Sequence, residues 1–162
     1  MQRATLDKKN LGHLRLAMPL FGDAILKASA PIDELTDYLQ FYQLPQDTSN
    51  LKLTAGTTED HETVIMSWRP TKSLGTVIVV HGYMDHIGLY GHLIRHLLGR
   101  QLTVVCLDLK GHGLSSGAAC SITSFGDYVA QVKSVIALCQ VHFEGPLHGI
   151  GQSMGGSVLM KH

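Results

Sequence analysis

The sequence has few cysteines, no excess of charge and no long apolar run, and each of these features excludes a class of protein. Three cysteines stand among 162 residues. Their odd number and the lack of C-x-x-C spacing argue against a disulfide framework or a metal site and favour a reducing compartment. Thirteen basic and thirteen acidic residues cancel, so neither a nucleic acid nor an anionic membrane is expected as a partner. No transmembrane segment is predicted, because no apolar run reaches spanning length.

What the sequence does contain predicts a folded domain. The chain is 44% hydrophobic and 16% charged, which is enough apolar material for a core. Residues 14–30 have the outline of a secretory signal, with basic residues upstream and an Ala-x-Ala at 28–30. Asp23 and Lys27 interrupt this stretch, however, and Pro19 splits it. We therefore expect a cytoplasmic protein and leave peripheral membrane association open; export is less favoured.

Strand and helix patterns alternate along the chain. Residues 1–50 are interpreted as an N-terminal leader with one short amphipathic helix at 33–44. Residues 51–56 and 63–68 flank a polar turn and predict a hairpin. The later segments alternate, with strands at 75–80, 102–107 and 146–150 and helices at 89–99 and 125–142. The fold class is therefore α/β, with a mostly parallel sheet after an antiparallel hairpin and ligands at the carboxyl ends of its strands.

A glycine-flanked serine stands near the end of the chain. Gly151-Gln152-Ser153-Met154-Gly155 follows a predicted strand and precedes a segment that can form a helix. This G-x-S-x-G pattern is typical of a nucleophile elbow, a tight turn that exposes the serine hydroxyl. Gly151 and Gly155 would let the strand and the helix pass close to each other without Cβ clashes. The context predicts that Ser153 is a nucleophile.

The same expression occurs a second time, at residues 113–117. That copy runs into the small, polar segment GAACS, where no helix can start. Because an elbow needs a strand before it and a helix after it, we interpret Ser115 as part of a glycine-rich turn.

Three motifs together indicate a family. His81-Gly82 follows one strand, the loop Asp108-x-x-Gly-His-Gly-x-Ser follows the next, and the Ser153 motif follows a third. In this order they resemble the α/β-hydrolase fold family, more narrowly its monoacylglycerol lipase, lysophospholipase and serine aminopeptidase group, over about residues 60–162. The resemblance implies an ester hydrolase without a cofactor that acts on a small ester or lipid, such as monoacylglycerol or lysophospholipid.

The resemblance also implies roles for individual residues. The backbone N–H groups of Tyr83 and Met154 would stabilise the oxyanion that forms when Ser153 attacks a carbonyl. Gly82 would let the first loop approach the substrate. His81 would have a structural role in supporting its motif, and we also expect His112 and Asp108 to shape their loop rather than to transfer protons.

The position of Ser153 conflicts with a complete catalytic triad. In α/β-hydrolases the acid and then the histidine follow the serine in the chain, but here His162 alone follows it, about 13 Å further along a continued helix and on its opposite side. Residues 51–162 are therefore expected to be the N-terminal part of a hydrolase domain, truncated after the elbow and lacking the later strands, the lid and the triad Asp and His. We expect an inactive form with an exposed sheet edge that promotes self-association.

Other functions compete with this interpretation. The chain could be a non-catalytic binding or assembly module derived from a hydrolase. A nucleotide-binding domain is less favoured, because both glycine-rich loops miss the third glycine of G-x-G-x-x-G and no phosphate-binding G-x-x-x-x-G-K-[ST] occurs. His92 and His96 have the spacing of zinc ligands, but HLIRH lacks the glutamate that would act as base.

Overall fold

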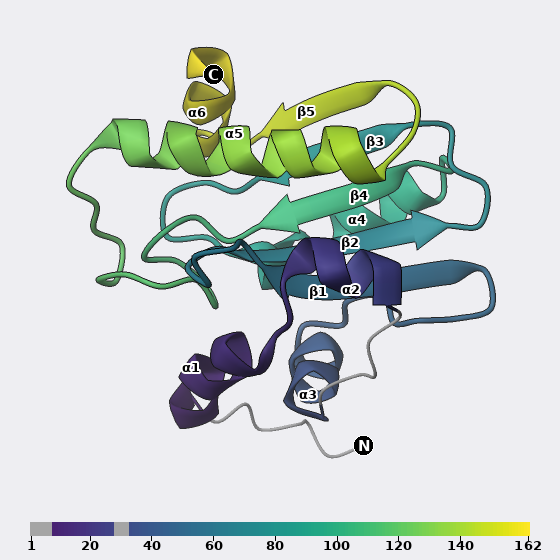
Figure 1. The fold of residues 1–162 in the computed structure, drawn as a ribbon, viewed down its shortest axis with the longest axis horizontal. Coiled ribbons are helices and arrows are strands. Elements are labelled where there is room, and N and C mark those ends of the chain that lie inside the picture. Colours follow the sequence, from purple (N-terminus) through teal and green to yellow (C-terminus); the bar gives the residue numbers. More distant parts are fainter. Residues whose placement is uncertain (1–7, 28–32) are drawn as a thin grey trace.

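The computed structural model describes residues 8–27 and 33–162 and contains one five-stranded sheet, in the order β1-β2-β4-β3-β5 (Figure 1). The strands are β1 Leu51–Thr57, β2 Val64–Pro70, β3 Thr76–Val80, β4 Thr103–Leu107 and β5 Leu147–Gly151. The helices are α1 Lys8–Ala17, α2 Phe21–Lys27, α3 Asp33–Phe41, the 3-10 turn η1 Ile87–Tyr90, α4 Gly91–Leu98, α5 Phe125–His142 and α6 Met154–Lys161.

The pairing of the strands confirms the predicted fold class. β1 and β2 form an antiparallel hairpin, and β2 joins the sheet antiparallel to β4. The remaining pairs, β4 with β3 and β3 with β5, are parallel. Consequently the carboxyl ends of β3, β4 and β5 lie side by side, and the three sequence motifs begin there.

The inner strands are buried on both faces, as their continuous apolar runs predicted. Residues of β3 alternate between two apolar cores: Val77 and Val79 face one core, and Ile78 and Val80 face the other. Helices α3 and α4 contribute to the first core, and α5 to the second. In Figure 1, α5 and α2 lie in front of the sheet and α4 lies behind it.

The N-terminal segment has more structure than the single helix predicted for it. Two further helices, α1 and α2, precede α3. Leu14 of α1 packs into the core with α3, whereas Phe21 of α2 packs into the core with α5. α2 also lies directly on β1, because a Cβ at Gly56 would stand 2.6 Å from the Cα of Phe21. Residues 28–30 of the signal-like stretch lie outside the described residues. Within the described ranges, no helix is long and apolar enough to cross a membrane.

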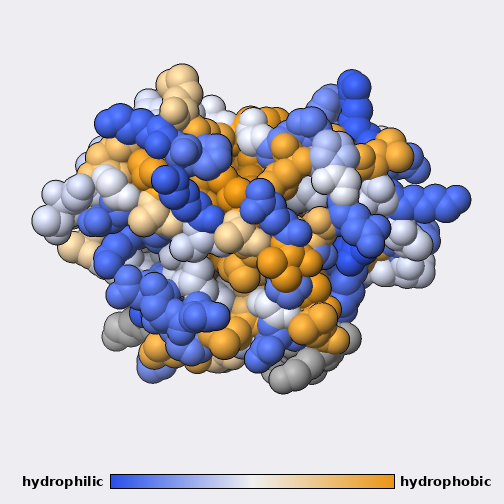
Figure 2. All heavy atoms as spheres, turned by 45° about the horizontal axis from the view of Figure 1, so that its top comes forward, coloured by the Kyte–Doolittle hydropathy of each residue, from blue (hydrophilic) through white to orange (hydrophobic). Residues whose placement is uncertain are grey.

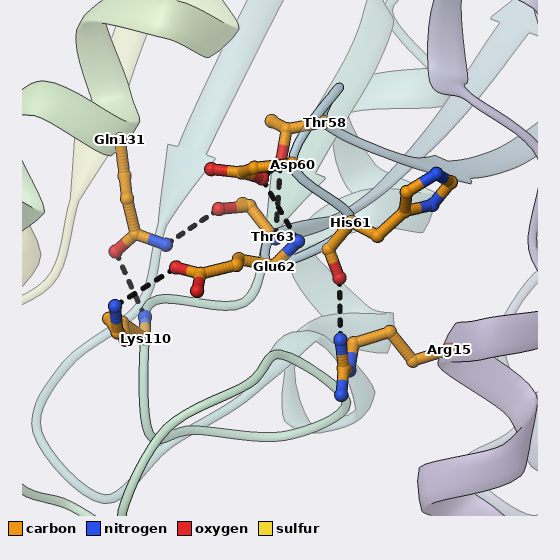
Figure 3. A network of polar contacts seen from close by, with 8 residues as sticks. All are labelled: Arg15, Thr58, Asp60, His61, Glu62, Thr63, Lys110 and Gln131. Atoms are coloured by element: carbon orange, nitrogen blue, oxygen red, sulfur yellow. Dashed lines mark hydrogen bonds and ion pairs between the residues drawn. The ribbon is translucent and has the colours of Figure 1, made fainter.

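A polar network connects the hairpin turn to three other parts of the fold (Figure 3). Lys110, in the loop after β4, forms an ion pair of 2.9 Å with Glu62. Gln131 of α5 donates to the hydroxyl of Thr63 at 2.7 Å and accepts from the backbone N–H of Lys110 at 2.9 Å. Arg15 of α1 donates to the carbonyl oxygen of His61. The network therefore ties the hairpin turn to α1, to α5 and to the loop after β4.

Candidate active site

Ser153 lies on a strained turn between β5 and α6. The strand ends at Gly151, the helix begins at Met154, and Ser153 has φ 49° and ψ −111°. Such a backbone conformation is rare for a residue with a side chain and persists only where the surrounding structure enforces it. Ser153 is exposed, and its side chain makes no capping hydrogen bond to the helix. The turn therefore presents the hydroxyl at the carboxyl end of the sheet.

The two glycines of this motif are required by close backbone contacts. A Cβ at Gly155 would stand 2.2 Å from the carbonyl oxygen of Val80, at the end of β3. A Cβ at Gly151 would stand 2.4 Å from the backbone nitrogen of Gly156. Neither distance is physically possible, so only glycine lets the start of α6 lie against β3 and the end of β5.

The loop after β3 lies beside this turn. A Cβ at Gly82 would be 3.5 Å from the carbonyl oxygen of Gln152, the residue before Ser153. The loop reverses direction through a hydrogen bond of 3.2 Å from Asp85 N–H to the Gly82 carbonyl and through Met84, which has φ 64°. The structure thus brings the Gly82 loop and the Ser153 turn together, so that Tyr83 directly follows one of two neighbouring residues, Gly82, and Met154 lies two residues after the other, Gln152.

His81 is buried and both of its ring nitrogens are occupied. Nδ1 is 2.7 Å from the carbonyl oxygen of Gly82, and Nε2 accepts a 2.9 Å hydrogen bond from Leu109 N–H. Burial lowers the pKa of His81 to about 4, and the hydrogen bond to Gly82 opposes this only in part. The ring is therefore neutral at physiological pH and connects the loop after β3 to the loop after β4. A structural role for His81 stays a prediction, and this geometry is compatible with it.

Asp108 organises the loop after β4. One carboxylate oxygen accepts from Ile87 N–H at 2.7 Å, and the other from Leu114 N–H at 2.8 Å. Burial raises the pKa of Asp108 to about 7, against the lowering effect of these two donors. Gly113 packs on the carboxylate, because a Cβ there would lie 2.1 Å from it. Asp108 thus holds η1 and its own loop in place, as a loop-shaping residue does.

His112 and Tyr83 pack against each other beside the Gly82 loop. Their ring centroids are 5.9 Å apart, and His112 also lies 5.0 Å from His81. Nδ1 of His112 is 3.0 Å from the carbonyl oxygen of Lys110, while its buried Nε2 has no partner. The Tyr83 hydroxyl donates to the carbonyl oxygen of Cys120 at 3.1 Å. The Tyr83 side chain therefore joins the loop after β3 to the loop after β4. The backbone N–H of Tyr83 is the group that was predicted to contact an oxyanion.

The second G-x-S-x-G motif is part of a loop and contains no elbow. Ser115 Oγ accepts from Val64 N–H at 2.8 Å and donates to the Asp108 carbonyl oxygen at 2.6 Å. No helix follows it before α5. Both hydrogen-bonding functions of the hydroxyl are used within the fold, so this serine is not presented to a substrate.

Among the described residues, no hydrogen bond joins a histidine to the Ser153 hydroxyl. His86 lies 3.2 Å from the Tyr38 hydroxyl, and His162 bonds the carbonyl oxygen of Leu159 at 2.8 Å. His92 and His96 are exposed on α4, and the described part of the chain contains no group of three residues that could hold a metal ion. Within residues 8–27 and 33–162, the serine is therefore positioned without a hydrogen-bonded histidine.

A large cleft of about 940 Å³ lies elsewhere on the molecule. Leu26 of α2, Leu138 of α5 and the hairpin turn line it, and the turn of Ser153 does not. Because chemistry requires the nucleophile in or beside the binding space, we place the candidate site at the Ser153 turn rather than in this cleft.

Sequence reasoning did not identify two residues that hold the site together. The Tyr90 hydroxyl accepts from Gly82 N–H at 3.1 Å. The Tyr38 hydroxyl, on α3, accepts from Gly88 N–H at 3.1 Å. Neither tyrosine belongs to a motif of charged or glycine residues, and Tyr38 lies in the segment that carried no family resemblance, so no sequence signal pointed to them.

The sheet order, the glycine-dependent turn at Ser153 and the loop after β3 define the chain as an α/β-hydrolase. A family model described as serine aminopeptidase, S33, matches residues 71–162, and the chain belongs to this family. The family resemblance expected from the three motifs is confirmed.

Individual proteins show similarity to the same part of the chain. Human "Monoglyceride lipase" is 36% identical over 95 residues, covering 57% of this chain and 31% of that protein. "Monoacylglycerol lipase" of Mycolicibacterium smegmatis is 30% identical over 97 residues, or 59% of this chain and 35% of that protein. The chain thus spans about a third of the length of these curated relatives.

Solved structures support the fold. The monoacylglycerol lipase of Paleococcus ferrophilus superposes with a TM-score of 0.52 and 31% identity, covering 62% of this chain and 37% of that one. A monoglyceride lipase from Saccharomyces cerevisiae superposes with a TM-score of 0.56 at 21% identity, covering 72% and 39% respectively.

Proposed function

We propose that this protein is a serine hydrolase of carboxylic esters with Ser153 as its nucleophile. The observation that carries the proposal is the backbone of Ser153, which is held at positive φ by glycine contacts on both sides and presents an exposed side chain without a capping bond to the helix. A fold does not retain such strain without a reason, and exposing a nucleophile at a strand–helix turn is one.

The reaction follows from this placement. Ser153 Oγ attacks the ester carbonyl carbon, its proton passes to a base, and the carbonyl oxygen becomes an oxyanion. The carbon–oxygen bond to the alcohol then breaks, and water hydrolyses the acyl-enzyme. The Met154 N–H, first in α6 and without an intrahelical acceptor, and the Tyr83 N–H would stabilise the oxyanion. Loss of one such donor costs about 3 kcal/mol of transition-state stabilisation.

A lipid-like substrate is supported by the surface near the turn. Tyr83, Met84 and Leu89, all in the loop from β3 to α4, are 56%, 69% and 56% exposed. These apolar side chains would contact an acyl chain whose carbonyl lies at Ser153. The names of the relatives, monoacylglycerol and monoglyceride lipases, agree with this substrate class.

The proton acceptor is proposed to come from outside these 162 residues, in a longer chain or from a partner. His81 has both ring nitrogens occupied, and Nδ1 of His86 contacts Tyr38. His112 has Nδ1 on the Lys110 carbonyl, and its Nε2 is buried, with no hydrogen bond to Ser153 among the described residues. Without a base the serine keeps the reactivity of an ordinary alcohol, so the 162-residue chain alone should turn over esters near the background rate.

Labelling by a fluorophosphonate probe tests the nucleophile in the full-length protein. We expect Ser153→Ala to abolish labelling and Ser115→Ala, the matched control in the other motif, to retain it. Labelling that depends on Ser115 and not on Ser153 would refute the proposal.

A non-catalytic binding or assembly module is the second candidate. It is favoured by one observation, the absence of a hydrogen-bonded base at Ser153 among the described residues. A folded full-length protein that no serine-directed probe labels, but that binds a fluorescent monoacylglycerol, would support this function instead.

A further inference from the structure

The hydroxyl of Tyr90 connects the two backbone segments that carry the proposed oxyanion donors. It accepts a hydrogen bond of 3.1 Å from Gly82 N–H. It also lies 2.5 Å from the side-chain oxygen of Gln152 and 3.0 Å from a carboxylate oxygen of Asp85. Gly82 directly precedes Tyr83, and Gln152 lies two residues before Met154. One phenol group thus contacts both sides of the site across 62 residues of sequence.

The hydrogen bonds of this hydroxyl are directional. A phenol has one proton to donate, so Tyr90 donates either to Gln152 or to Asp85 at a given moment while it accepts from Gly82. Burial and the nearby carboxylate of Asp85 raise the pKa of Tyr90 to about 12. The hydroxyl therefore keeps its proton at physiological pH, and it joins both segments while it donates to Gln152 and accepts from Gly82.

The hydrogen bond to the Tyr90 hydroxyl fixes the direction of the Gly82 N–H. Rotation of the loop that broke the Gly82–Tyr90 hydrogen bond would also move the following peptide, whose N–H belongs to Tyr83. The loop has a second internal tie, from Asp85 N–H to the Gly82 carbonyl at 3.2 Å. That tie shapes the turn itself but does not reach the Ser153 segment, whereas Tyr90 reaches both.

We propose that Tyr90 is a positioning residue that sets the placement of the Tyr83 N–H relative to Ser153 and the Met154 N–H. This inference rests on the proposed hydrolase function. Tyr90 touches no reacting atom and acts through Gly82 and Gln152. Because oxyanion donors are used more strongly in the transition state than in the substrate complex, a displaced donor lowers kcat more than it raises KM.

The test is steady-state ester hydrolysis by full-length Tyr90→Phe, which removes the hydroxyl and keeps the ring. We expect kcat to fall about 10- to 100-fold with KM nearly unchanged, because a displaced donor costs less than the removal of a whole donor. Tyr42→Phe is the matched control, because the Tyr42 ring also packs near η1, at 4.8 Å from His86, without a tie to Gly82. It should keep the wild-type kcat.

A second variant separates positioning from folding. Gln152→Ala removes the other partner of the hydroxyl and should also lower kcat, and the double variant should lose less than the product of the two single effects, because both act through one contact. The inference would be overturned if the fold-loss of kcat in the double variant equalled the product of the two single losses, or if Tyr90→Phe kept the wild-type kcat. If Tyr90→Phe lowers the melting temperature, the kcat values of Gln152→Ala and of the double variant decide whether Tyr90 acts through positioning. Failure of the proposed function would appear differently, as a wild-type protein with no Ser153-dependent activity.

Discussion

The side-chain hydroxyl of Ser115 donates a 2.6 Å hydrogen bond to the backbone carbonyl oxygen of Asp108. The same hydroxyl accepts from Val64 N–H, at the start of β2, so it joins the loop after β4 to the hairpin. The motif that looks like a second nucleophile elbow is therefore a hydrogen-bonded connection within the fold.

Replacement of Ser115 should destabilise the chain. Ser115→Ala leaves Val64 N–H and the Asp108 carbonyl without their partner, which costs about 1–3 kcal/mol. Urea denaturation would measure the loss. Ser116→Ala is the matched control: the Ser116 Oγ is buried without a partner, so its removal should leave stability unchanged or raise it. Equal losses for the two variants would contradict the role assigned to Ser115.

Gly155, two residues after Ser153, should tolerate no side chain. In Gly155→Ala the new Cβ would meet the Val80 carbonyl oxygen at 2.2 Å, so α6 must move away from β3. We expect a loss of more than about 3 kcal/mol of stability, at the upper end of overpacking effects, and no labelling of Ser153. Gly156→Ala meets its nearest atom at 3.2 Å and gains helix propensity, so its stability should stay within about 1 kcal/mol of wild type. Thermal melts and probe labelling would compare them.

Two buried groups should have opposite effects on the pH dependence of stability. The pKa of His81 is lowered from 6.5 to about 4, so the unfolded chain binds its proton more readily and stability falls as pH falls through this range. The pKa of Asp108 is raised from 3.8 to about 7, so the folded chain binds its proton more readily and stability falls as pH rises through that range.

The two effects overlap between about pH 4 and 6.5 and should nearly cancel in the wild type. Asp108→Asn removes one of them, so its stability should rise across this window by up to about 3 kcal/mol, the amount that a shift of this size implies for His81. Denaturation midpoints measured from pH 4 to 7 would show the change in slope. Wild-type and variant curves that run parallel would show that Asp108 does not titrate in this range.

The N-terminal helix α3 should support the loop of the candidate site. The Tyr38 hydroxyl lies 3.2 Å from Nδ1 of His86 and accepts from Gly88 N–H at 3.1 Å. Tyr38→Phe would remove both contacts and leave Gly88 N–H with its 3.2 Å hydrogen bond to Nδ1 of His86 alone, so the loss should be about 0.5–1.5 kcal/mol. Tyr42→Phe, one turn further along, should cost less than about 0.5 kcal/mol. Native-state hydrogen exchange at Gly88 would test whether the loss is local, since faster exchange is expected in the Tyr38 variant alone.

Most of the sheet was predictable because its strands carry strong local patterns. The continuous apolar runs of β3 and β4 require burial on both faces, and the hairpin has turn residues between two short strands. The strand, turn and helix around Ser153 were predictable for a similar reason, whereas its role as nucleophile stays a prediction. Helices α1 and α2 were not predicted: Gly22 and Asp23 weaken the helical pattern of α2, and the burial of both helices depends on contacts with distant elements.

The polar contacts around the site lay outside the reach of sequence reasoning. Tyr90 and Gln152 are 62 residues apart, and Tyr38 and Gly88 are 50 residues apart. No periodicity or spacing relates such pairs, because they meet only after β3, β4 and β5 align in parallel at one edge of the sheet. The structural role predicted for His81 comes from the motif and stays a prediction; the contacts of its two ring nitrogens, with the Gly82 carbonyl and Leu109 N–H, could be seen only in the fold.

The last prediction concerns self-association of the 162-residue chain through β5. Among the described strands, β5 pairs with β3 alone and forms one end of the sheet. Ile150 is 38% exposed, and Met160 on the neighbouring α6 is 83% exposed. Figure 2 views the molecule with the top of Figure 1 turned toward the reader, and on this face apolar surface lies between hydrophilic side chains. An unpaired strand edge beside apolar side chains is a template for pairing with another chain.

Ile150→Lys places a charge on this edge strand and should therefore reduce the association. Sedimentation velocity of the 162-residue chain should show oligomers for the wild type and a larger monomer fraction for Ile150→Lys. Val141→Lys, on α5 and 77% exposed, adds the same charge to an apolar position away from the edge and should associate as the wild type does. If the wild type is a monomer, or if both variants raise the monomer fraction equally through their added charge, then the edge of β5 is not the contact surface.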